Sequence, residues 1–151
     1  MPSRQVRDIL EVIRSIHRGL AHRYEAMSSA TDHERFRTLL ADMGQHELRI
    51  DNALADYEQG AANAQLETWL QFGAEEELQR LIETTDLNAT LPPEELVHRA
   101  MVIDNALVAQ YRELQATTSV PEIEDLFVSL VALQESKQRH YAHAITELTM
   151  D

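Results

Sequence analysis

The sequence contains no cysteine, so the chain can form neither disulfides nor thiolate metal sites. A metal site would therefore need histidine and carboxylate ligands. Only four glycines and four prolines interrupt the 151 residues, which favours long helices. A chain of this length can bury one sizeable core, and we expect a single domain over residues 1–151.

Basic residues and long apolar runs are also scarce. The 13 lysines and arginines face 26 acidic residues, and the formal net charge of −13 disfavours nucleic acid and anionic membranes as partners. No apolar run reaches the ~18 residues of a membrane-spanning helix, and the start, MPSRQVRDIL, lacks the apolar core of a signal peptide. We therefore expect a soluble, cytoplasmic protein that binds neither nucleic acid nor membranes.

Apolar residues recur every three or four positions near the start of the chain, which predicts two long helices. The first is expected over about residues 3–29, with Ser3 as its N-cap. Thr31 and Glu34 form a capping box before the second helix, which Gly60 is expected to end. The two apolar stripes consist of Ile9, Ile13, Ile16, Leu20, Tyr24 and Met27, then Phe36, Leu39, Leu40, Met43, Ile50 and Leu54.

The second half of the chain has the same organisation. Pro92 and Pro93 suit the first turn of a third helix, and Ser119 and Glu122 form a capping box before a fourth. Their stripes consist of Leu96, Ala100, Ile103, Leu107, Tyr111 and Leu114, then Ile123, Leu126, Phe127, Leu130, Tyr141 and Ile145. Two hairpins, 3–59 and 92–149, joined by a long crossover, predict an all-α four-helix bundle.

The crossover over 61–91 is expected to contain a helix of its own, lying across the bundle and weakened by Gly73. The apolar residues that predict it are Leu66, Trp69, Leu70, Leu78, Leu81 and Ile82. Trp69, Leu70 and Phe72 either cover the bundle or contact a second subunit. We favour the second subunit, because a lone crossover helix leaves an apolar face exposed, and so expect a homodimer.

The two hairpins match each other at a constant offset of 87 residues, without a gap over roughly 40 residues. The aligned pairs include Ile16 with Ile103, Leu20 with Leu107, Tyr24 with Tyr111, Leu39 with Leu126 and Met43 with Leu130. Because the agreement includes both tyrosines and extends across the loop, we favour a true repeat. A repeated hairpin predicts a bundle of approximate twofold symmetry, with paired positions at its centre.

Polar residues interrupt the buried stripes at matching depths. They are His17 and its repeat mate Asp104, Glu47 and its mate Gln134, and Lys137, whose mate is Ile50. A buried charge is costly unless it is paired or bound to a metal. The sequence therefore predicts a polar centre in the middle of the bundle, which Tyr24 and Tyr111 either support by hydrogen bonding or adjoin as core residues.

This pattern resembles the ferritin-like superfamily, and most closely its rubrerythrin-type branch. In that family each hairpin has a glutamate, six residues and a tyrosine, then Glu-x-x-His on the second helix. The matching segments are His17-Arg-Gly-Leu-Ala-His-Arg-Tyr24, Met43-Gly-Gln-His-Glu47-Leu-Arg-Ile50, Asp104-Asn-Ala-Leu-Val-Ala-Gln-Tyr111 and Leu130-Val-Ala-Leu-Gln134-Glu-Ser-Lys137. The resemblance covers about residues 16–51 and 103–138. It implies a ferritin-like fold with a carboxylate-bridged di-iron centre that handles Fe(II), oxygen or peroxide.

Most of the six ligand positions implied by the resemblance are altered. Glu47 is retained, Asp104 is a shortened glutamate, and His17 replaces a glutamate with another competent ligand. Gln134 is a poor ligand, Ile50 offers no donor atom, and the Lys137 ammonium repels metal ions.

Three interpretations of the centre remain open from the sequence. In the first, the centre binds two metal ions. In the second, it binds one divalent metal, iron or another, held by His17, Glu47 and Asp104. In the third, it binds no metal. In the last case Lys137 pairs with the two carboxylates, while His17 and Gln134 complete the hydrogen bonds.

Other metal-ligating patterns lie outside this centre. Glu95 and His98 form the only literal Glu-x-x-His, but the helix period turns His98 to solvent. His140 and His143 could hold a surface metal. A one-residue bulge in the fourth helix would bring Glu135 to the centre and His140 towards it.

These observations leave three functions open. The chain is a binding or structural module with a lost or remodelled di-iron centre, a metal-dependent oxidoreductase using iron or manganese, or a dimeric interaction protein.

Overall fold

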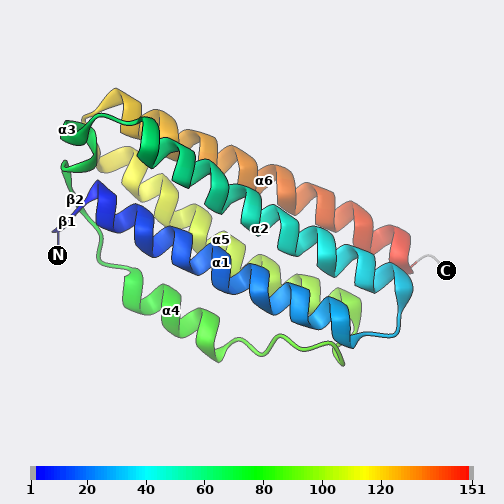
Figure 1. Ribbon diagram of the computed structural model, residues 1–151. Coiled ribbons are helices and arrows are strands. Elements are labelled where there is room, and N and C mark those ends of the chain that lie inside the picture. Colours follow the sequence, from blue (N-terminus) through cyan, green and yellow to red (C-terminus); the bar gives the residue numbers. More distant parts are fainter. Residues whose placement is uncertain (1–2, 150–151) are drawn as a thin grey trace.

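The computed structural model describes residues 3–149 and confirms the all-α class. Of the six helices in this range, four are long and lie side by side (Figure 1): α1 (Val6–Ala30), α2 (Glu34–Gly60), α5 (Pro93–Thr117) and α6 (Pro121–Thr149). α1 and α2 form one antiparallel hairpin, α5 and α6 form the other, and α2 packs against α6. None of the described helices is long and apolar enough to cross a membrane.

The boundaries of the long helices repeat at the offset seen in the sequence. α1 begins at Val6 and α5 at Pro93; α1 ends at Ala30 and α5 at Thr117. These positions differ by 87 residues, as do the first residues of α2 and α6. Equivalent residues of the two hairpins therefore lie at equivalent points along equivalent helices.

The crossover is built differently from the single helix expected there. It contains α3 (Asn63–Leu66), the strand β2 (Trp69–Gln71) and α4 (Glu75–Thr84), which lies along the outside of the bundle (Figure 1). β2 pairs antiparallel with β1 (Ser3–Gln5), with Arg4 opposite Leu70. Residues 69–71 are extended because they bond to the start of the chain, and Gly73 lies in the break before α4. The prediction of a helix within the crossover is confirmed for α4, but its extension back through Gly73 to Leu66 was wrong.

The crossover packs onto the bundle through its apolar residues. Leu70 and Phe72 are buried, whereas 64% of Trp69 is exposed. Arg23 of α1 anchors the end of α4 by donating from Nη1 to the carbonyl of Ile82 and from Nη2 to that of Thr85, both at 2.9 Å.

Two of the predicted helix caps are displaced. Ser3 lies in β1, and α1 begins after Gln5. α2 begins after His33, whose ring accepts the Phe36 N–H at 3.1 Å, so Thr31 does not cap it and instead accepts the His33 N–H. A ring nitrogen serves here because any side-chain acceptor that reaches an unpaired first-turn N–H can cap a helix.

The other predicted boundaries agree more closely. Pro93 occupies the first turn of α5, and α6 begins at Pro121, two residues after the expected cap at Ser119. Gly60 ends α2 but has no positive φ angle, so it does not terminate the helix through a left-handed turn.

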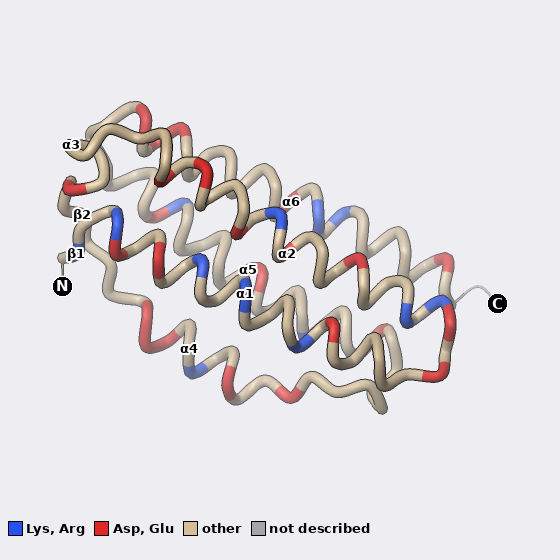
Figure 2. The backbone as a smooth tube through the Cα atoms, viewed as in Figure 1, with Lys and Arg blue, Asp and Glu red and all other residues tan. Residues whose placement is uncertain are grey.

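One continuous core joins the four long helices and the crossover. The fully buried side chains at its centre include Leu20, Leu40, Met43, Leu107 and Phe127. Acidic residues are spread along the long helices and α4 (Figure 2), in keeping with the net charge of −13.

Candidate functional site: a buried polar centre

The structure places all five polar residues of the predicted centre in the interior. His17, Glu47, Asp104, Gln134 and Lys137 are each at most 1% exposed, and they come from all four long helices. Lys137 is the only lysine in the sequence, and it has no solvent contact. An ammonium group buried this deeply needs charged partners.

The helical period explains why these side chains point inward. His17 lies between Ile13 and Leu20 on α1, and Glu47 lies between Met43 and Ile50 on α2, so each shares a face with core residues. The antiparallel hairpins then bring distant positions together. His17 meets Glu47 from one hairpin, and Asp104 meets Lys137 from the other.

A chain of hydrogen bonds links four of the five residues to Tyr111. The Tyr111 hydroxyl lies 2.6 Å from Nε2 of His17, whose Nδ1 contacts Oε2 of Glu47. Because a carboxylate oxygen only accepts, Nδ1 of His17 carries a proton and donates to Glu47, and Nε2 shares a second hydrogen bond with the tyrosine hydroxyl. Lys137 Nζ then donates to Glu47 Oε1 at 2.6 Å and to Asp104 Oδ1 at 3.1 Å.

The electrostatics of the centre depend on Lys137. Burial raises the pKa of Glu47, but the Lys137 charge and the His17 ring outweigh it and lower the pKa to about 2. Burial lowers the pKa of Lys137, yet Glu47 and Asp104 together raise it above its usual value. Glu47 and Lys137 are therefore both charged at neutral pH, as a buried ion pair.

Asp104 is the weaker of the two carboxylates. Burial raises its pKa to about 6, because the attraction of Lys137 only partly offsets burial and the repulsion of Glu47. One ammonium thus fully stabilises Glu47 but only partly stabilises Asp104.

The centre also contains polar atoms that lack partners among the described residues. They are the hydroxyls of Tyr24 and Tyr141 and both amide atoms of Gln134. The metal-free interpretation expected Gln134 to complete the hydrogen bonds of the centre, and in this respect it was wrong. Burial, followed by the charges of Asp104 and Glu47, raises the pKa of Tyr24 well above 10, and burial followed by Glu47 and Asp104 does the same for Tyr111.

Sequence reasoning placed Tyr141 in the core but missed its relation to the centre. It lies one turn after Lys137 on α6, and its pKa is raised by burial and then by Glu47 and Asp104. Its ring makes an edge-on contact with His46, at 5.9 Å between centroids. The spacing of four residues from Lys137 was the signal that could have revealed this relation.

The residues present do not fit a di-metal centre. Ile50 places a hydrocarbon at one of the ligand positions that the resemblance implies, and the Lys137 ammonium lies between the carboxylates of Glu47 and Asp104. Among the side chains described, no group of three or more His, Asp or Glu residues is placed to hold a metal ion. The positive charge beside both carboxylates is supplied by the ammonium of Lys137.

The hypothesis of a bulge in the fourth helix is wrong. α6 is regular from Pro121 to Thr149. Glu135 is on its outer face, where it pairs with Arg112 at 3.0 Å. His140 is also mostly exposed and bonds to Asp42 of α2 at 3.0 Å, and His98 is exposed, as its position on the helix predicted.

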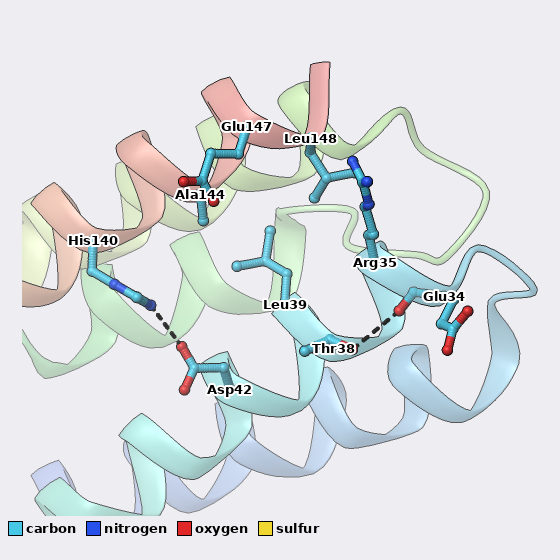
Figure 3. A pocket seen from close by; sticks show the side chains of 9 residues that line it. All are labelled: Glu34, Arg35, Thr38, Leu39, Asp42, His140, Ala144, Glu147 and Leu148. Carbon is cyan, nitrogen blue, oxygen red and sulfur yellow. Dashed lines mark hydrogen bonds and ion pairs between the residues drawn. The ribbon is translucent and has the colours of Figure 1, made fainter. Parts of the chain in front are cut away.

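A surface groove of about 840 Å³ lies between α2 and α6, towards the end of the bundle (Figure 3). The His140–Asp42 bond joins the two helices on one side of it, and Leu39 projects between them (Figure 3). The remaining lining residues are Glu34, Arg35, Thr38, Ala144, Glu147 and Leu148. The groove is separate from the polar centre, whose side chains are inaccessible to solvent.

Comparisons with protein-family models, curated proteins and solved structures found no match to this chain.

Proposed function

We propose that this chain is a ferritin-like protein in which an internal ion-pair network has replaced the di-metal centre, and that it acts as a metal-independent binding or structural module. The observation that carries the proposal is the position of Lys137. Its ammonium bonds to both Glu47 and Asp104, the two carboxylates among the six expected ligand positions. The repeated helix boundaries and the tyrosines at matching positions support the ferritin-like part of the proposal.

The network gives each buried carboxylate at least one hydrogen-bond donor from the protein, without any bound ion. Two carboxylates and one ammonium are buried together, and His17 donates to the carboxylate that also binds Lys137. Breaking such a network is costly, since any one partner removed leaves a buried charge behind. The centre therefore has a structural role, and ligand binding by the module takes place at its surface.

Metal content after incubation tests the proposal. The purified protein is incubated separately with Fe(II), Mn(II) and Zn(II), freed of unbound ions by gel filtration and analysed by mass spectrometry. Glu47→Gln removes the best ligand of the centre, and His140→Ala with His143→Ala removes the surface histidines. We expect the wild type to bind no more metal than Glu47→Gln. One or two metal ions per chain that disappear in Glu47→Gln, but persist in the surface variant, would overturn the proposal.

A second candidate function is self-association through the crossover, which the exposure of Trp69 favours. This side chain is 64% exposed, while Leu70 and Phe72 beside it are buried. The residues that contribute most to binding at protein interfaces are enriched in tryptophan. We infer that Trp69 contributes to a homodimer contact. Light scattering at increasing concentration is expected to give a dimer for the wild type and a monomer for Trp69→Ala; a wild-type monomer at all concentrations would exclude it.

A further inference from the structure

The two hairpins contribute equivalent residues to the centre, which form two sets that each combine residues of both hairpins. Only one of these sets is fully hydrogen-bonded. At the offset of 87, His17 corresponds to Asp104, Tyr24 to Tyr111, and Glu47 to Gln134. All six side chains are at most 1% exposed. Differences in their bonding therefore come from the side chains themselves and not from different access to solvent.

The first set, which consists of Tyr111, His17 and Glu47, is complete. The Tyr111 hydroxyl is hydrogen-bonded to Nε2 of His17 at 2.6 Å, and Nδ1 of His17 donates to one oxygen of Glu47. The other oxygen of Glu47 accepts from Lys137 at 2.6 Å. Each of these polar side chains has at least one protein partner.

The equivalent set, which consists of Tyr24, Asp104 and Gln134, is incomplete. By the approximate symmetry, the Tyr24 hydroxyl should bond to Asp104 as Tyr111 bonds to His17, but aspartate is much shorter than histidine. Gln134 should bond to Asp104 and to the residue equivalent to Lys137, which is Ile50 and has no polar atom. The Tyr24 hydroxyl and both amide atoms of Gln134 consequently lack partners among the described residues.

Buried polar groups without protein partners are characteristically bonded to ordered water. A water molecule can accept from Tyr24 and from the Gln134 amide, and can donate to a carboxylate such as Asp104. We propose that Tyr24, Asp104 and Gln134 form a binding site for ordered water inside the bundle. The water takes the place of the hydrogen-bond partners that the first set has and this set lacks. Tyr141, whose hydroxyl is also buried and unpartnered, extends this site. The inference does not depend on the proposed function, because it rests on the unpartnered atoms and on the repeat of the two hairpins.

Oxygen-17 relaxation dispersion, which detects water molecules held inside a protein, tests the proposal. The full-length wild-type protein is compared with Gln134→Leu, which keeps the approximate size but removes both amide atoms. The matched control is Tyr111→Phe, which removes the hydroxyl that has a protein partner. We expect long-lived internal water in the wild type, at least one molecule fewer in Gln134→Leu, and no decrease in Tyr111→Phe.

A second variant, Tyr24→Phe, covers the case in which Gln134→Leu does not fold, and it is also expected to lose internal water. Two results would overturn the proposal. The first is a wild-type protein without long-lived internal water. The second is an undiminished amount in every folded variant of the site. Neither result bears on metal content, so this test is distinguishable from that of the proposed function.

Discussion

Replacing Lys137 with methionine should destabilise the protein strongly, because it removes the charge shared by two buried carboxylates. Methionine approximately fills the space of the lysine side chain but leaves Asp104 without its ammonium partner and Glu47 with His17 alone. Breaking a buried ion pair from one side costs about 3–5 kcal/mol. For a domain of this size each kcal/mol corresponds to about 2–4 °C in Tm, so we expect a decrease of roughly 6–20 °C.

The loss should also depend on pH. Without the ammonium, both carboxyl groups bind protons more readily, and a neutral carboxyl group is cheaper to bury. The difference between wild type and Lys137→Met should therefore be larger at pH 7 than at pH 5. Urea denaturation at both pH values measures it, from the free energies of unfolding.

A matched control distinguishes the effect of losing a buried ion pair from the effect of losing any ion pair. Arg112→Met breaks the Arg112–Glu135 pair, whose side chains are 57% and 42% exposed. Surface pairs contribute about 0–1 kcal/mol. If Lys137→Met costs no more than Arg112→Met at pH 7, the reasoning about the centre is refuted.

Three further changes test other parts of the structure. Asp104→Asn should flatten the pH dependence of stability, because the folded-state pKa of Asp104 is raised to about 6 from 3.8. The contribution of Asp104 to the free energy of unfolding is therefore present at lower pH and is lost as the pH rises through 6. Urea titrations from pH 4 to 7 measure this dependence, and an unchanged slope would contradict the reasoning. Gly19→Ala should stabilise by about 0.5–1 kcal/mol, since an added Cβ meets nothing within 4 Å, whereas Gly44→Ala should gain less, because its Cβ would lie 3.2 Å from Glu25 Cγ; thermal denaturation compares them, and equal gains would contradict the close packing at Gly44. Arg23→Met should increase amide hydrogen exchange at the end of α4, whose carbonyls it binds; unchanged exchange there would show that the contact does not anchor α4.

Helix periodicity was sufficient to predict the four long helices and the burial of the polar centre. Both follow from the repeat of core positions, since a side chain flanked by core residues at three and four positions, such as His17 or Glu47, must also point inward. The offset of 87 likewise appears in the helix boundaries, because the same apolar spacing produces the same helices.

Features that depend on contacts between distant segments were not predictable in this way. The β1–β2 pair joins residues 3–5 to residues 69–71, and three-residue strands have no period of their own. His33 caps α2 although Thr31 is the better capping residue by type, because the position of the chain decides which atom reaches the first turn. Similarly, the spacing placed Gln134 at the centre but could not show that its neighbours are too short or too apolar to bond to it.

The charge and environment of Lys137 test the proposed ion-pair centre most directly, and its being the only lysine makes the measurement simple. In protein labelled with ¹⁵N-lysine, NMR would follow the single Nζ signal from pH 6 to pH 10. Glu47 and Asp104 outweigh burial and raise the pKa of Lys137. We therefore predict an ammonium signal that exchanges slowly with solvent and keeps its proton over this range. A signal that exchanges as rapidly as that of an exposed lysine, or that titrates below the usual lysine pKa, would contradict the proposed ion-pair centre.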